Sequence, residues 1–187
     1  MTYFEENVMF MRAFLICAVI SLLSQSALAD SYSLTGENTK IKFVGTKKDG
    51  SHTGGFKKLT GKATAKSSDP ETLSLNVVID VDSMHTDADK LTAHLKSPDF
   101  FEVKRYPEAK FESTDVKLTK NGHVVSGNLT LHGQTKKLSF PADITIDPAG
   151  LKLVAKFKID RNNWGISYGK GMINDEVAMN IEVTAKK

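Results

Sequence analysis

Apolar and polar residues alternate with a period of two along most of the chain after residue 30. In a β-strand this period places successive side chains on opposite faces, so that one face is buried and the other is wet. The clearest example is 151–159, where apolar residues alternate with lysines and only Val154 breaks the pattern. The pattern predicts an all-β fold made of antiparallel sheet.

Short turn signals separate the alternating segments. Asn121-Gly122 is the strongest, because a type I′ hairpin turn needs positive φ at both central residues, and His132-Gly133 and Pro148-Ala149-Gly150 are weaker signals. About eight strands are expected at this spacing, enough to close into a barrel without exposed edges. The expected strands are 41–46, 56–65, 73–81, 111–118, 124–131, 138–146, 151–159 and 177–183.

One segment departs from the strand period. Thr86 and Asp89 have the spacing of a capping box, and Leu91 and Leu95 then lie four residues apart on one helical face. These residues predict a short helix at 87–95, which ends before Pro98. Such a helix could cover one end of a barrel.

The first 29 residues have the pattern of a secretory signal. A basic start at Met11-Arg12 precedes the apolar run 13–23, and small residues end at Ala29. We therefore expect translation to start at Met11, cleavage after Ala29, and a mature domain at 30–187 that is soluble and periplasmic. No later stretch approaches the roughly 20 apolar residues that a membrane-spanning helix needs, so no stable membrane insertion is expected.

Cysteine content and charge narrow the chemistry. The only cysteine, Cys17, lies in the signal, and Ile16 before it argues against processing as a lipoprotein, so the mature chain has no thiol for a disulfide or metal site. The net charge is only +3, and the lysines are spread along wet strand faces. A continuous basic stripe is therefore missing, and nucleic acid is not expected as a partner.

No enzyme motif accompanies the five histidines His52, His85, His94, His123 and His132. Their spacing forms neither a metalloprotease motif nor a part of a serine-hydrolase or phosphate-binding signature. Asp87 and Asp89 are explained as helix-capping and dipole partners, and His94 as a residue that makes a local hydrogen bond. No catalytic residue, metal site or cofactor is predicted.

Longer motifs resemble one protein family. The run Lys90-Leu91-Thr92-Ala93-His94-Leu95-Lys96-Ser97-Pro98-Asp99-Phe100-Phe101 is followed in order by Tyr106-Pro107, Phe111-Glu112-Ser113-Thr114, Gly127 to Lys136, Asp160 to Gly165 and Asp175-Glu176-Val177. Together with Gly54-Gly55-Phe56 these motifs cover nearly the whole mature chain. They are similar to those of the YceI-like family of polyisoprenoid-binding, lipocalin-like periplasmic proteins.

The resemblance implies an extended, lipocalin-like, eight-stranded barrel that carries a long apolar lipid, such as a polyprenyl or acyl chain. The residues expected to contact such a ligand face inward on strands or lie at the barrel mouth: Phe43, Phe101, Phe111, Leu129, Leu131, Phe140, Ile144, Leu153, Phe157, Trp164, Met172, Ile173, Met179 and Ile181. Many relatives have an Arg-Asp pair where this chain has Leu91-Thr92, so functions that depend on that pair are not carried over.

An alternative function shares the same fold. The inward residues could simply fill the barrel, and the protein would then be an interaction module that works through its surface loops. The sequence does not decide between a filled and a hollow barrel, and it leaves a homodimer open.

Overall fold

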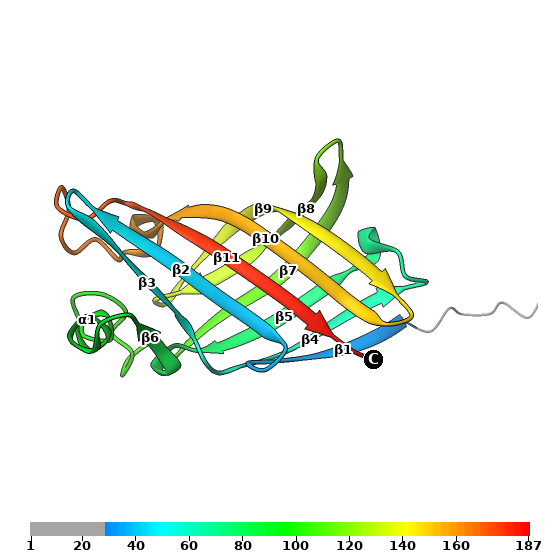
Figure 1. Ribbon diagram of the computed structural model, residues 1–187, viewed down its shortest axis with the longest axis horizontal. Coiled ribbons are helices and arrows are strands. Elements are labelled where there is room, and N and C mark those ends of the chain that lie inside the picture. The colour runs from blue at the N-terminus through cyan, green and yellow to red at the C-terminus, as the bar shows by residue number, and fades with distance from the viewer. Residues whose placement is uncertain (1–28) are drawn as a thin grey trace, which may run out of the picture.

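The computed structural model describes residues 29–187, which form a single antiparallel sheet of eleven strands (Figure 1). The predicted signal segment, apart from Ala29, lies outside the described residues. Hydrogen-bonded neighbours follow the order β1-β4-β5-β7-β8-β9-β10-β11-β2-β3-β6. The strands are β1 (Ala29–Thr35), β2 (Thr39–Lys47), β3 (Gly50–Phe56), β4 (Leu59–Lys66), β5 (Ser74–Asp80), β6 (Met84–Thr86), β7 (Glu108–Thr119), β8 (Gly122–Leu131), β9 (Gln134–Asp147), β10 (Gly150–Asp160) and β11 (Glu176–Ala185).

The sheet is curled into a half-barrel around an apolar interior. Its two edge strands are β1 and β6. Because the sheet curls, β1 also packs against β11, although the two strands are not neighbours in the hydrogen-bonding order. The inward rows come from the strand period, as in β10, where Leu151, Leu153 and Ala155 are buried, and Lys152 and Val154 between them are exposed. The all-β prediction is confirmed.

The expected number of eight strands is wrong, because β1, β3 and β6 were missed. Each has a weak alternation signal: β1 has only two buried apolar residues, Tyr32 and Leu34, β3 is rich in glycine and polar residues, and β6 has three residues. These strands are held by backbone hydrogen bonds to neighbouring strands. The alternation of apolar and polar side chains does not predict such pairing.

The helix α1 (Asp89–Leu95) confirms the predicted helix, but the predicted capping box is wrong. Thr86 Oγ1 does not cap the helix; it lies 2.8 Å from both Ala88 O and Thr92 Oγ1. Thr92 Oγ1 also accepts a hydrogen bond of 2.9 Å from Thr86 N. The hydroxyls therefore join the first turn of the helix to the end of β6, in place of a side-chain cap.

One hairpin turn differs from the expected type, and another confirms its weaker signal. Only Gly122 has positive φ in the β7–β8 hairpin, so Asn121-Gly122 is not a type I′ turn. His132 and Gly133 have φ of 49° and 72°, and Leu131 pairs directly with Gln134. The type I′ geometry therefore lies in the β8–β9 turn, which is the weaker signal in the sequence.

The two ends of the sheet differ. The segment α1, the β2–β3 turn and the loop 165–175 lie together at one end, and the C-terminus and the start of β1 lie at the opposite end (Figure 1). At the latter end, Tyr32 and Leu151 are fully buried, and Ile146 and Ala185 pair with Leu151 from either side. This end is closed by packed side chains.

Candidate functional site

An internal cavity of about 360 Å³ occupies the interior of the curled sheet. Its volume lies within the range of about 300–1,000 Å³ that is typical of small-molecule sites. The lining extends along β2 from Thr39 to Lys47, a strand length of about 26 Å at about 3.3 Å per residue. The cavity is therefore long and narrow, and it reaches the end of the molecule that carries α1.

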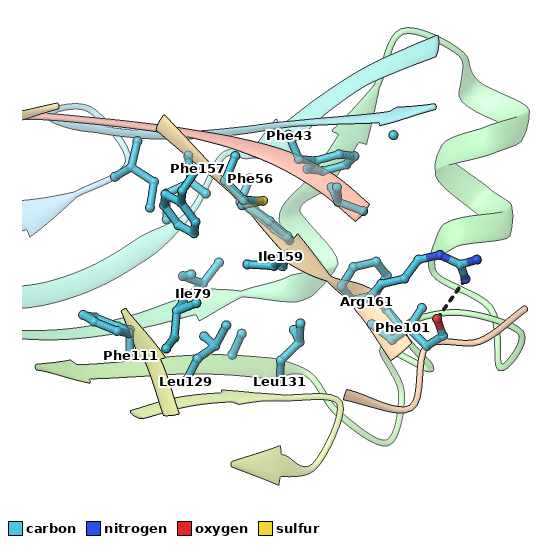
Figure 2. A pocket seen from close by; sticks show the side chains of 18 of the residues that line it. Phe43, Phe56, Ile79, Phe101, Phe111, Leu129, Leu131, Phe157, Ile159 and Arg161 are labelled. Carbon is cyan, nitrogen blue, oxygen red and sulfur yellow. Dashed lines mark hydrogen bonds between the residues drawn. The ribbon is translucent and has the colours of Figure 1, made fainter. Parts of the chain in front are cut away.

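Most of the lining is aromatic or aliphatic. The rings of Phe140 and Phe157 stack with centroids 4.5 Å apart, and Phe111 packs against Phe140 at 5.5 Å. Nearer the mouth, Phe43 and Phe56 lie 6.0 Å apart in a tilted arrangement. Figure 2 shows the rings of Phe43, Phe56, Phe111 and Phe157 turned toward a space that they share with Leu129, Leu131 and Ile159. Such a surface can hold an apolar chain but offers it few hydrogen bonds.

Glycines on neighbouring strands make room for two of the rings. A Cβ atom at Gly127 would lie 2.6 Å from Phe111 Cζ, and one at Gly54 would overlap Phe43 Cζ and lie 2.6 Å from His85 O. The absence of a side chain at these positions therefore allows Phe43 and Phe111 to lie flat against the sheet.

We expect Gly127→Ala to destabilise the protein by about 1–3 kcal/mol, because the added methyl group must displace Phe111 or the strand. Gly45→Ala is the matched control: Gly45 also lines the cavity, but a Cβ there meets nothing within 4 Å. That variant should be neutral or stabilised by about 0.5 kcal/mol. Urea denaturation of the two variants measures the difference, and equal stabilities would contradict the proposed role of Gly127.

The mouth of the cavity is covered from one side by α1 and the segment after it. Leu91, Leu95, Phe100 and Phe101 line the cavity there. Of the pair Leu91-Thr92, the apolar side chain of Leu91 faces the cavity, and the Thr92 hydroxyl accepts a hydrogen bond from Thr86 N.

Loop 165–175 meets this helical segment across the mouth. The rings of His94, Phe100 and Tyr168 form a cluster in which each pair of centroids is 5.0 Å apart. His94 Nε2 also lies 2.9 Å from Asp99 Oδ2, in agreement with the local hydrogen bond that the sequence predicts. The cluster joins two covers of the mouth that are about 75 residues apart in the chain.

Arg161 holds loop 165–175 in place. Its side chain is buried, lines the cavity and directs all its donors at the loop: Nη1 donates to Ile166 O and Tyr168 O at 2.8 Å, and Nε and Nη2 reach Asn174 O and Ile173 O at 3.2 Å. Nη2 also lies 3.3 Å from Asp175 Oδ1. Figure 2 shows Arg161 at the edge of the apolar lining, with one of these hydrogen bonds. The guanidinium thus satisfies loop carbonyls that otherwise have no strand partner.

On the opposite rim, Asp87 ties β3 to the segment before α1. His52 Nδ1 lies 2.8 Å from Asp87 Oδ1, and Thr53 N donates to Asp87 Oδ2 at 2.9 Å. The Thr53 hydrogen bond, followed by that of His52, lowers the pKa of Asp87 below its usual value. Asp87 therefore does not act as a helix cap, and the partly exposed His52 lines the cavity mouth.

We expect Asp87→Asn to lower stability at neutral pH, with the deficit shrinking in acid. A carboxylate whose folded pKa is depressed stabilises the fold above its unfolded pKa of about 3.9, and this contribution disappears as the pH falls through the folded value. Thermal unfolding from neutral pH to below about pH 3.9 tests this. Asp49→Asn is the control, because Asp49 lies in the adjacent β2–β3 turn and has no ion pair with any of residues 29–187. A deficit independent of pH would contradict the role of the charge.

Eleven of the fourteen predicted ligand-contacting residues line the cavity, although whether they touch a ligand stays a prediction. They are Phe43, Phe101, Phe111, Leu129, Leu131, Phe140, Leu153, Phe157, Ile173, Met179 and Ile181.

Ile144, Trp164 and Met172 do not line the cavity, so their predicted place in the lining is wrong. Ile144 faces inward but is packed in the buried core, where it pairs with Leu153. Trp164 is buried behind the lining and donates from Nε1 to Leu129 O at 3.0 Å. Met172 is 70% exposed at the tip of loop 165–175. Alternation and segment type do not distinguish cavity lining from packed core or loop surface.

Several lining residues escaped the sequence analysis. Leu91 and Leu95 carried a usable signal, since their four-residue spacing on a helix expected to cover the barrel end places both on the inner face. Phe56 also lines the cavity, and its place next to Gly54-Gly55 was a second usable signal. Lys47 and Arg161 gave no signal, because charged residues beside apolar strands are ordinarily solvated.

Residues 29–187 contain no group of three or more metal-ligating side chains. Over the same residues, no helix is both long and apolar enough to cross a bilayer.

Comparison with known proteins decides the family. The profile of the YceI-like domain matches residues 32–185, almost all of the described chain. The chain belongs to the YceI-like family.

Relatives among bacterial proteins agree with this assignment. A UPF0312 protein of Photorhabdus laumondii is 33% identical over 142 residues, covering 72% of this chain and 74% of its own. Another UPF0312 protein, from Serratia proteamaculans, is 37% identical over 139 residues, covering 70% and 71%.

Solved structures share the fold. Burkholderia cenocepacia BcnA matches with a TM-score of 0.71 at 22% identity, over 78% of this chain and 94% of its own. The Campylobacter jejuni YCEI protein matches with a TM-score of 0.63 at 26% identity, over 72% and 84%. A polyisoprenoid-binding domain from Saccharophagus degradans matches with a TM-score of 0.66 at 16% identity, over 85% and 99%.

Proposed function

We propose that this YceI-like protein is a periplasmic carrier that holds one long apolar lipid in the cavity of its curled sheet. The single observation that carries the proposal is the long cavity lined by apolar side chains and closed at one end by packed residues. The polyisoprenoid-binding domain from Saccharophagus degradans has the same fold, and this makes an isoprenoid chain the first candidate. The signal pattern at 11–29 supports export.

The polarity of the lining gives the ligand a direction. Thr46, Lys47 and His52 are at the mouth, while at the other end Thr39 donates its hydroxyl to Asn38 Oδ1 and offers the cavity little. An amphiphile would therefore enter tail first and leave its head group at the mouth, where it can keep its water or bond to these side chains.

Burial of the ligand's apolar surface is by itself sufficient for tight binding. At about 25 cal/mol per Å², a chain that buries about 400 Å² gains about 10 kcal/mol before the entropy costs of association. The inward face provides few polar partners, so apolar chains of several types should compete for the cavity. We propose no covalent chemistry.

The interaction module with a filled barrel is less well supported, because its interior would contain no cavity. Mass spectrometry of gently purified protein, before and after organic extraction, distinguishes the two functions. We expect a stoichiometric long-chain lipid. Repeated recovery of lipid-free protein, together with no uptake of a fluorescent polyprenyl or acyl chain, would exclude the carrier.

A further inference from the structure

The rim of the cavity mouth carries an exposed apolar side chain between unpaired lysines. Met172, 70% exposed, stands at the tip of loop 165–175, and Tyr168 in the same loop is 43% exposed. Lys170 lies two residues before Met172, and Lys47 and Lys48 lie in the adjoining β2–β3 turn. Within residues 29–187, none of these three lysines has a carboxylate within ion-pair distance.

Backbone contacts hold these side chains in one place. Ile173 forms isolated bridges with both Lys47 and Lys170, and Asn174 N donates to Thr46 O at 2.9 Å. The tip itself is a tight turn, in which Met172 N and Ile173 N both donate to Gly169 O at 2.9 Å. Met172 and the three lysines are therefore presented together on a fixed rim.

The charge of this rim is net positive. Asp49 is the one acidic residue of the β2–β3 turn, Asp175 is paired with Arg161, and Asp87 on the opposite rim is paired with His52. A surface that combines lysines with one protruding apolar side chain matches an anionic bilayer, because lysines are attracted to its phosphates while the apolar group enters the acyl boundary.

We propose that the protein docks mouth-first on an anionic phospholipid bilayer, with Met172 inserted and Lys47, Lys48 and Lys170 at the phosphates. This inference rests on the proposed carrier function, since a lipid that passes from a bilayer into the cavity avoids water only if the mouth faces the bilayer. The closed end and the C-terminus then point away from the membrane (Figure 1).

Vesicle co-sedimentation tests the docking surface. Wild type should bind mixed phosphatidylethanolamine–phosphatidylglycerol vesicles more tightly than phosphatidylcholine vesicles, and added salt should weaken this binding. Lys48→Ser and Lys170→Ser should each weaken it about fivefold, and Met172→Ser about tenfold. These side chains do not line the cavity, so uptake of a fluorescent acyl chain without vesicles should stay unchanged.

Lys42→Ser and Lys156→Ser form the matched control, because both lysines lie on the outer face of the sheet beside Asn180. They should weaken vesicle binding less than about twofold. The inference is overturned if wild type shows no preference for phosphatidylglycerol, or if the outer-face variants weaken binding as much as the rim variants. Failure of chain uptake by wild type in solution contradicts the carrier function instead, so the two failures are distinguishable.

Discussion

Leu129→Trp should weaken binding of a long-chain lipid about 70-fold while leaving the fold intact. Leu129 is partly buried on β8 and points into the cavity, so the larger indole takes space that the ligand needs (Figure 2). If the ring keeps about 100 Å² of ligand surface in water, the loss is about 2.5 kcal/mol, which corresponds to this factor. Displacement of a fluorescent acyl chain, measured alongside thermal unfolding, gives both quantities.

Val154→Trp provides the control for added size. Val154 is 40% exposed and points outward from β10 between the inward residues Leu153 and Ala155. Its replacement adds the same indole to the sheet without touching the cavity, so the affinity should change less than about twofold. Unchanged affinity in a well-folded Leu129→Trp variant would show that the ligand does not occupy this cavity.

Arg161→Met should destabilise the protein by about 3 kcal/mol, because four loop carbonyls lose their donor and part of them stays shielded from water. The loss should concentrate in loop 165–175, where Ile166 is almost fully buried and Ile173 lines the cavity. Hydrogen exchange should therefore accelerate in this loop well before it does in the strands. Urea denaturation gives the global change.

Arg105→Met is the corresponding control on the surface. Arg105 is mostly exposed, approaches Glu102 only at 3.8 Å and lies 5.2 Å above the Tyr106 ring, so its loss should change stability by no more than about 1 kcal/mol. If both arginine variants are equally stable, Arg161 does not hold loop 165–175 in place as we describe. Arg161→Lys should recover only part of the loss, because one ammonium cannot reach all four carbonyls.

The strand period was the strongest signal in the sequence, and it determined most of the interior. In 151–159 and 177–183, alternation correctly identified inward residues such as Leu153, Phe157 and Met179, because burying one face of a strand requires apolar residues at every second position. The helix at 89–95 was equally accessible from the spacing of Leu91 and Leu95. Motif order identified the family.

Only the tertiary structure decided which inward residues line a cavity and which fill the core. Ile144 and Leu153 are cross-strand neighbours in the same apolar–polar alternation, yet only Leu153 borders the cavity. The reason is that side chains from distant strands decide where the interior is filled and where it stays open. The role of Arg161 could not be predicted for the same reason, since its hydrogen-bond partners lie 5 to 14 residues further along the chain. The pairing of β3 with β6 likewise depends on how separate segments meet, and the sequence did not predict it. Local sequence fixes which way a side chain points, whereas cavities, clamps and rims arise where separate elements meet.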